Sequence, residues 1–213
     1  SAWLQRLLAR DSWRITSMNV REIYLAPTLT QRKFWAFIRW LDKVLLGESA
    51  YRYLLERDRR WLDSIQMHKV GLFTPDEDEG MLILLWATMF LQFVFPVVKE
   101  LPPYHRFDED LPEKDKAQIM GFYRAIIRRH LHAKGGALTY LAKSPAHSGR
   151  IESIYEFFPD ARIICLARNP MHLVPSVTNF FRYIWRYMGV SLPNGFHLEY
   201  IFDQIRYWYL YPV

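Results

Sequence analysis

The sequence predicts an α/β protein in which helices predominate around a small parallel sheet. Two short apolar segments with strand character, 137–142 and 162–167, are each followed by a stretch with helical periodicity, 148–158 and 170–184. The order strand, helix, strand, helix implies a parallel βαβ unit with a right-handed crossover. Because 51% of the 213 residues are hydrophobic, the chain has enough apolar material for a full core. We therefore predict a single domain over residues 1–213.

The first part of the chain is predicted to be helical. Apolar residues recur at helical spacing over 3–10, 31–46 and 50–67, and Gly47 follows the second of these stretches. Glycine is the usual residue just beyond a helix end. We therefore expect three helices, the second of which ends at Gly47.

A further helix is expected to start at Thr74. Threonine is a good N-cap, Pro75 suits the first helical position, and the carboxylates that follow would face the positive end of the helix dipole. The apolar stretch 81–98 is near the length of a membrane span, but it contains Gln92 and Pro96 and has an acidic start. A buried core helix is the better interpretation, and we expect no membrane span.

The last predicted helices frame the two strands. Pro112 opens a helix that Gly135 and Gly136 close, and Pro170 opens another after the second strand. Because 162–167 is apolar nearly throughout, we expect a strand that is buried on both faces.

The composition limits the classes of ligand and partner that the chain is expected to bind. With 28 Lys and Arg against 22 Asp and Glu, the formal charge of +6 favours anionic ligands. The charge is dispersed, with no basic run of five or more, so we expect no nucleic-acid partner. The one cysteine, Cys165, excludes an intrachain disulfide and a cysteine-based zinc cluster, which favours a reducing, cytoplasmic location. His130 and His132 are two apart on a predicted helix and face different ways, so we expect no metal site.

The two ends suggest a piece of a longer protein. The chain starts at Ser1 and runs directly into an apolar helix without a signal-peptide pattern, and its last residues, 207–213, are strongly apolar. We expect a domain truncated at both ends. The alternative is a natural terminus docked on the core.

Each predicted strand ends in a cation beside a helix start. Lys143 follows the first strand and Arg168 the second, at the sheet edge where ligands of parallel sheets bind. A helix N-terminus attracts anions, and Asn169 can cap the second helix. Ser176 lies about two turns further on, so a guanidinium and a hydroxyl could hold one phosphate group. The alternative is a helix cap with a surface salt bridge.

These motifs, in this order, resemble the PAPS-dependent sulfotransferases, where PAPS is 3′-phosphoadenosine 5′-phosphosulfate. The resemblance covers about Ser1 to Trp185 and is closest to the branch with a Pro-x-Glu-Asp-Glu element, here Pro75 to Glu79. It implies a P-loop-type three-layer fold with a parallel sheet. The matching residues are Lys143-Ser144-Pro145, Gly149-Arg150-Ile151, Phe158-Pro159-Asp160-Ala161-Arg162-Ile163, Leu166-Ala167-Arg168-Asn169-Pro170 and Val174-Pro175-Ser176.

The resemblance also implies roles for individual residues. Arg168 and Ser176 match the pair that binds the 3′-phosphate, and Lys143 matches the lysine beside the sulfuryl group and its leaving phosphate. Ser1 and Ala2 fall on the last two positions of the 5′-phosphosulfate loop, whose earlier positions precede this chain.

Sulfuryl transfer also needs a base for the acceptor. The resemblance favours the acidic element, so Glu77 or Glu79 is the candidate, and His147 is the next choice, followed by His68. The alternative role for these acids is compensation of a helix dipole. Because two residues on a helix diverge by about 200°, at most one of the glutamates can face the acceptor.

The function implied is transfer of a sulfuryl group from PAPS to a hydroxyl or amine of a small-molecule, lipid or carbohydrate acceptor. Two alternatives stay open at this point. One is a non-catalytic relative that acts as a binding or scaffold protein. The other is a different P-loop nucleotide-dependent transferase such as a kinase, although the chain has no Gly-Lys-Ser/Thr loop. The sequence does not indicate an oligomeric state.

Overall fold

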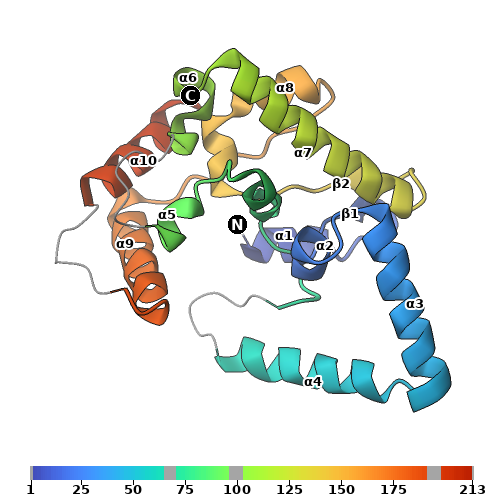
Figure 1. Ribbon diagram of the computed structural model, residues 1–213. Helices are drawn as coiled ribbons and strands as arrows, with labels where there is room; N and C mark the ends of the chain where they lie inside the picture. The colour runs from blue at the N-terminus through green and yellow to red at the C-terminus, as the bar shows by residue number, and fades with distance from the viewer. Residues whose placement is uncertain (1, 65–70, 96–102, 191–197, 213) are drawn as a thin grey trace. The chain divides into compact units, whose positions relative to one another are not determined.

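The computed structural model describes residues 2–64, 71–95, 103–190 and 198–212 (Figure 1). The residues group into two compact units, each with many contacts within itself. The first consists of Ser1–Met81 and Ala125–Lys143, and the second of Leu82–Arg124 and Ser144–Val213. Each unit is described by itself below, and the expectation that residues 1–213 form one domain stays a prediction.

The first unit contains a small parallel sheet surrounded by helices. Its strands pair in parallel, with Ile15 opposite Thr139 and Thr16 opposite Tyr140. Its elements are α1 (Ala2–Leu8), β1 (Ile15–Thr16), α2 (Val20–Tyr24), α3 (Leu29–Leu46), α4 (Ser49–Ser64), the last part of α7 (Glu113–Ala133) and β2 (Thr139–Tyr140). The α/β class with a parallel sheet is therefore confirmed, with helices in large excess.

Local signals place the end of α3 and the start of α4 within a residue of where the sequence predicts them, whereas residues 65–67 of the predicted helix 50–67 lie outside the described residues. Thr28 and Gln31 form a reciprocal capping box at the start of α3, and Gly47, with φ of 57°, ends it in the left-handed conformation. The Asp42 carboxylate then accepts hydrogen bonds from the N–H groups of Ala50 and Tyr51, at 3.0 and 2.9 Å. These bonds satisfy free donors in the first turn of α4.

The prediction of an α-helix starting at Thr74 is wrong. The Thr74 hydroxyl bonds back to Gly71, Pro75 forms an antiparallel bridge with Asn19, and the Asp76 N–H donates to the Met18 carbonyl at 3.3 Å. Because these tertiary bonds occupy the backbone, an α-helical first turn cannot form there.

The single helix expected over 81–98 is also wrong. A 3₁₀ helix, η1 (Asp78–Leu85), is followed by a turn at Trp86, whose φ of 54° interrupts any helix, and by the short α5 (Leu91–Val94). Residues 96–98, with Pro96, lie outside the described residues.

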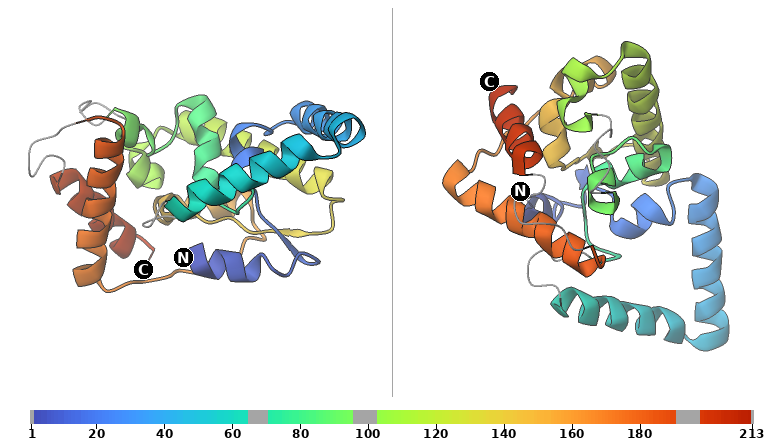
Figure 2. Two further views of the ribbon diagram at one scale, coloured as in Figure 1. Left: turned by 90° about the horizontal axis from the view of Figure 1, so that it is seen from below. Right: turned by 60° about the vertical axis from the view of Figure 1, so that its left-hand side comes forward.

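The second unit is helical. Its remaining elements are η2 (Tyr104–Arg106), α6 (Phe107–Asp110), the first part of α7, η3 (Pro145–Gly149), α8 (Ile151–Phe157), α9 (Pro170–Tyr187) and α10 (Leu198–Leu210). Helices α9 and α10 cross in both views of Figure 2 and share a core of Phe181, Trp185, Ile201 and Ile205.

The predicted second strand, 162–167, is wrong for this structure. These residues form no ladder with any described segment, and their side chains are exposed rather than buried on both faces. A strand exists only where a neighbour accepts and donates its backbone hydrogen bonds. The first predicted strand does form over part of its length, but its neighbour is β1, which precedes it by more than one hundred residues. The expected βαβα unit over 137–185 is therefore not formed.

Gly149, part of the matched sequence motif, has a packing role. A Cβ atom at this position would lie 2.2 Å from the His105 carbonyl oxygen and 3.2 Å from the Trp208 ring nitrogen. That nitrogen donates to the same carbonyl at 2.8 Å. Only glycine fits this close approach of η3 to η2.

A buried polar network joins β1 to three helices of the first unit. His130 of α7 is fully buried, with Nε2 2.8 Å from the Thr16 hydroxyl and Nδ1 3.1 Å from the Arg32 guanidinium. Because arginine can only donate, Nδ1 must accept, so Nε2 carries the proton and donates to Thr16. Arg32 also pairs with Glu22 of α2 at 3.3 Å, and Lys134 reaches the same carboxylate at 3.4 Å.

This geometry requires a neutral imidazole. Burial is the main cause that lowers the pKa of His130 to about 4; Glu22 opposes this shift, and the cations Arg32 and Lys134 add to it. A charged ring would lose its acceptor and face a guanidinium.

We therefore predict that acid weakens the fold through His130. Between about pH 6.5 and pH 4 the unfolded chain binds a proton that the folded chain does not, so stability rises with pH across this window. The loss on going down through it should reach about 3 kcal/mol. Urea unfolding at several pH values measures it, and a His130→Gln variant should show a flatter dependence. Equal slopes for the two proteins would contradict the prediction.

Candidate active site

The acidic turn, residues 76–79, is held against the start of the first unit by its backbone. The Gln5 side chain of α1 donates to the Asp76 carbonyl at 3.2 Å, and the bridge between Asn19 and Pro75 fixes the residue before the turn. The carboxylates are thus carried by a segment tied to both α1 and the loop after β1.

Side chains from β2 and the residues just after it hold two of these carboxylates. Lys143 Nζ lies 2.6 Å from Glu77 Oε1, and the Tyr140 hydroxyl donates to Asp78 Oδ2 at 3.2 Å. The Lys143 and Glu77 side chains are 10% and 18% exposed, so their ion pair is largely shielded from water but still reachable. The parallel pairing of β2 with β1 is what brings Lys143 to the acidic turn.

Two tyrosines border the turn as neutral donors. The Tyr24 hydroxyl lies against Gly80, where a Cβ would be only 2.1 Å from it. Burial of this end of the ring raises the pKa of Tyr24 to about 12, with further contributions from Asp76, Glu77 and Glu79. Burial, followed by the Asp78 charge, likewise raises the pKa of Tyr140. Both hydroxyls therefore keep their protons at neutral pH.

The two candidate bases differ in accessibility. Glu79 is completely buried, whereas Glu77 keeps some contact with solvent and lies directly on Lys143. A carboxylate paired with an ammonium group can accept a proton from an acceptor hydroxyl once the ammonium moves to another anion. The site therefore offers a cation, Lys143, and a potential base, Glu77, in direct contact.

The second unit carries Arg168 and Ser176. The Tyr209 hydroxyl of α10 binds the Arg168 backbone on both sides, accepting from its N–H at 3.2 Å and donating to its carbonyl. Asn169 caps α9 as predicted, with its side chain accepting from the Met171 N–H at 2.9 Å. Arg168 and Ser176 are both exposed.

His147 lies in η3 of the second unit. Its ring meets the buried ring of Tyr123 edge-on at 5.9 Å. Ser144 caps this 3₁₀ helix by accepting from the Ala146 N–H at 3.2 Å, and Pro145 occupies its first position. The Lys-Ser-Pro motif thus starts a helix immediately after it presents a lysine.

Comparison with known proteins decides the family. A model described as the sulfotransferase family matches residues 3–211, nearly the whole chain. The chain belongs to the sulfotransferase family.

Two curated sulfotransferases are similar to this chain. Both are named omega-hydroxy-beta-dihydromenaquinone-9 sulfotransferase Stf3, from Mycobacterium bovis (strain ATCC BAA-935 / AF2122/97) and Mycobacterium tuberculosis (strain CDC 1551 / Oshkosh). Each is 25% identical over 153 residues, which is 68% of this chain and 37% of the relative. The chain therefore spans little more than a third of these relatives. No solved structure matches it.

The structure brings together two of the residues selected from the sequence, Glu77 and Lys143. Glu79 is on the same turn but turned inward. His147, Arg168 and Ser176 belong to the second unit. Ser1 and His68 lie outside the described residues.

Tyr24 and Tyr140 were missed by the sequence analysis. Their hydroxyls meet the acidic turn from positions more than fifty residues away in the chain, and no local pattern marks such a contact. Tyr140 lies within the predicted first strand, so only its partner was unforeseen.

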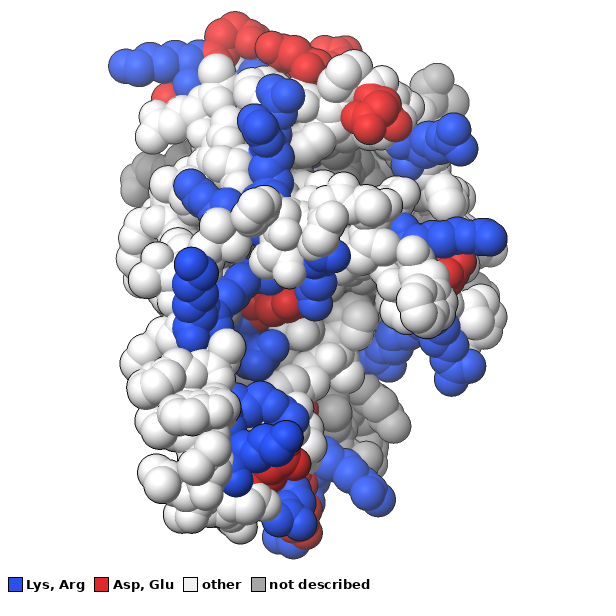
Figure 3. Space-filling view, turned by 90° about the vertical axis from the view of Figure 1, so that its right-hand side faces the viewer, with Lys and Arg blue, Asp and Glu red and all other residues white. Residues whose placement is uncertain are grey.

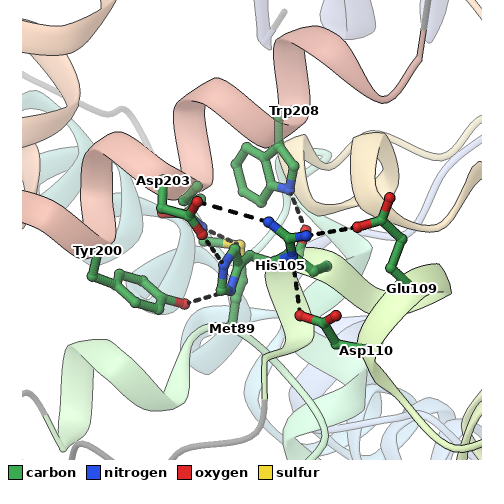
Figure 4. Close-up of polar contacts among 9 residues, drawn as sticks. Met89, His105, Glu109, Asp110, Tyr200, Asp203 and Trp208 are labelled. Atoms are coloured by element: carbon green, nitrogen blue, oxygen red, sulfur yellow. Dashed lines mark hydrogen bonds and ion pairs between the residues drawn. The ribbon is translucent and has the colours of Figure 1, made fainter.

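A second polar cluster, around His105, was also missed (Figure 4). The buried His105 ring has Nε2 3.1 Å from Asp203 and Nδ1 3.2 Å from the Tyr200 hydroxyl. Since the carboxylate can only accept, Nε2 donates to Asp203 and Nδ1 accepts from Tyr200. Beside it, Arg106 forms ion pairs with Glu109, Asp110 and Asp203. These bonds connect η2 to α10 and use both ring nitrogens, which is a structural role.

The described residues contain no group of three or more His, Cys, Asp or Glu side chains placed to hold a metal ion. Over the same ranges, no helix has both the length and the apolar character to cross a bilayer.

The Glu77–Lys143 pair should contribute measurably to stability. Lys143→Met leaves a shielded carboxylate without its cation, so we expect a loss of about 1–3 kcal/mol. In a double-mutant cycle with Glu77→Gln, urea unfolding should give a coupling energy of at least about 1 kcal/mol. The exposed pair Glu56–Arg60 is the matched control and should couple by no more than about 0.5 kcal/mol. Similar coupling for both pairs would contradict this view of the site.

Proposed function

We propose that this chain carries the acceptor-activating centre of a PAPS-dependent sulfotransferase with a P-loop-type three-layer fold. The reaction moves a sulfuryl group from PAPS to a hydroxyl or amine of an acceptor. The observation that supports it most is the 2.6 Å contact between Glu77 and Lys143, because it combines a base and a cation in a shielded position. Family membership over residues 3–211 supports the transfer chemistry.

Glu77 acts as the base in this proposal. The acceptor oxygen or nitrogen forms a bond to sulfur while the bond from sulfur to the bridging phosphate oxygen breaks, and that electron pair leaves with the phosphate. The acceptor proton passes to the Glu77 carboxylate. Glu79 is too deeply buried to receive it without a rearrangement.

Lys143 changes partner during the reaction. In the structure its ammonium group neutralises Glu77. When the ammonium turns to the leaving phosphate, it neutralises the charge that develops there and releases the carboxylate to accept the proton. This single movement provides both the cation for the leaving phosphate and the carboxylate for the acceptor proton. Glu77 can therefore act as a base only when an anion is present to bind Lys143.

Arg168 and Ser176 are proposed to hold the 3′-phosphate. Their fit rests on exposure and chemistry: Arg168 and Ser176 are both exposed, Arg168 directly before the N-cap of α9 and Ser176 in the second turn of that helix. The Met171 N–H at the start of α9 is already bound by Asn169, and Pro170 has no N–H. Side chains rather than helix amides must therefore bind the anion.

The acceptor we favour is a lipid-like alcohol. The similar mycobacterial proteins are named for a hydroxylated dihydromenaquinone-9, which favours a lipid over a small-molecule or carbohydrate acceptor. The chain has one cysteine, Cys165, and so cannot form an intrachain disulfide, which supports the cytoplasmic location proposed for the reaction.

The base assignment is tested with two matched variants of the complete protein. Glu77→Gln should lower turnover with PAPS by about 10²–10⁴-fold and leave the affinity for adenosine 3′,5′-bisphosphate within threefold. Glu79→Gln should mainly lower the melting temperature. Normal turnover in Glu77→Gln would remove it as the base and make His147 the next residue to change. Absence of transfer by the complete wild-type protein, with bisphosphate still bound, would favour a binding or scaffold role.

The 3′-phosphate assignment is tested by calorimetry on the complete protein. Arg168→Ala removes a charge-assisted hydrogen bond and should weaken binding of adenosine 3′,5′-bisphosphate by about 1.5–3 kcal/mol. Arg162→Ala, an exposed arginine in the same segment, is the control and should bind within a factor of two of wild type. Equal losses in the two variants would exclude a specific role for Arg168.

A further inference from the structure

Helix α3 presents an apolar stripe that nothing in the described residues covers. Phe34, Phe37, Ile38, Val44 and Leu45, here called the α3 stripe, are between 37% and 71% exposed. At about 100° per residue they share one side of the helix, within an arc of about 120°. The side chain of Trp40 stacks on Phe37 at 5.9 Å and is 56% exposed, which extends the stripe.

The exposed charges of α3 are positive, whereas its acidic residue is buried. Its single acidic residue, Asp42, is buried and spends its carboxylate on the N–H groups of Ala50 and Tyr51 in α4. Lys33 and Lys43 are both exposed; at about 100° per residue Lys33 lies at the edge of the stripe, between Trp40 and Val44, and Lys43 lies about 100° from Val44. Figure 3 looks onto the side of the molecule where α3 lies, and in its lower part blue basic side chains stand among white surface with small areas of red.

Helix α4 continues the same character. Tyr53, Leu54 and Trp61 are each more than 40% exposed. Arg57, Arg59 and Arg60 lie in its second half, and the one acidic residue among them, Asp58, is turned inward to accept from the Leu72 N–H at 2.8 Å. Arg60 pairs with the exposed Glu56, so Arg57 and Arg59 are exposed cations that add to the positive charge of this helix.

An apolar stripe with basic residues beside it is typical of helices that lie in the plane of a membrane interface. Isolated exposed apolar residues need no explanation, but a contiguous stripe of this size marks an interaction surface. A second copy of the chain would bring the same positive charges together, whereas an anionic bilayer would complement them. Tryptophan and phenylalanine also suit the boundary between headgroups and acyl chains.

We propose that α3 docks on the surface of an anionic phospholipid membrane, with the α3 stripe between the lipids. Lys33 and Lys43 then lie within about one Debye length of the headgroup charge, because a helix is only ~10–12 Å across. This goes beyond the proposed transfer reaction and does not rest on it, since its test needs neither PAPS nor an acceptor.

The experiment is sedimentation of the chain with vesicles. Vesicles of phosphatidylcholine with 30% phosphatidylglycerol should bind it at 0.1 M salt, at least tenfold more strongly than vesicles of phosphatidylcholine alone. Raising the salt to 0.5 M should weaken the binding, because exposed charges are screened. Equal binding to both vesicles, or none to either, would overturn the proposal.

Two matched pairs of variants locate the contact. Lys33→Gln with Lys43→Gln should weaken binding up to about 25-fold, at roughly fivefold for each cation near the surface. Lys114→Gln with Arg128→Gln, on exposed positions of α7, should change it less than threefold. Phe37→Ser with Leu45→Ser should weaken binding at least 20-fold. Trp13→Ser with Leu210→Ser, two exposed apolar positions elsewhere, should leave it nearly unchanged.

Two measurements keep the result interpretable. Circular dichroism establishes that each variant is folded as wild type is. Light scattering determines the oligomeric state, and a dimer that dissociates in the Phe37→Ser and Leu45→Ser variant, without vesicle binding, would overturn the proposal in favour of an interface between copies.

Discussion

The hydrogen bonds of His130 are the interaction on which the first unit depends. The sheet contributes only two residue pairs, which is too little to hold β1 and β2 in place alone. The buried ring attaches Thr16 of β1 to α7 and, through Arg32 and Glu22, to α3 and α2. Lys143 follows β2 by three residues, so its approach to the acidic turn depends on a strand pair that this network positions. The position of the Glu77–Lys143 ion pair thus depends on the neutral His130.

Stability and chemistry make opposite demands on the acidic turn. Four carboxylates in succession repel one another, and the structure offsets this with Lys143 on Glu77 and Tyr140 on Asp78. In the proposed mechanism, however, Lys143 leaves Glu77. The Tyr140 bond and the backbone bond from Gln5 to Asp76 do not involve the lysine, so they keep the turn in place while the ion pair opens. Because other bonds hold the turn, the Glu77–Lys143 ion pair can stabilise the free protein and still open during the proposed reaction.

What the sequence predicted well is what neighbouring residues determine. The end of α3 follows from Gly47 and the start of α9 from Asn169 and Pro170, whose effects act within one turn. The errors lie where distant segments compete for the backbone, as at Pro75, or where a strand needs a partner, as over 162–167. Lys143 and the acidic turn were selected by motif. Because Lys143 follows a predicted strand, at the sheet edge where functional groups gather, a contact between the two could be expected. Tyr24, Tyr140 and His105 had no such signal because their partners are remote in the chain.

The same network that positions Lys143 also orients the exposed stripe of α3. Arg32 lies in the first turn of α3 and bonds His130, while Phe34 and Phe37 begin the stripe within the next turn and a half. The guanidinium cannot rotate about the helix axis without breaking its bonds to Glu22, to His130 and to the Ala26 carbonyl. The direction of the stripe is therefore tied to β1, and through β1 to β2 and the ion pair at its end. A membrane that binds the stripe would consequently fix the orientation of β1, β2 and the Glu77–Lys143 pair relative to the lipid surface.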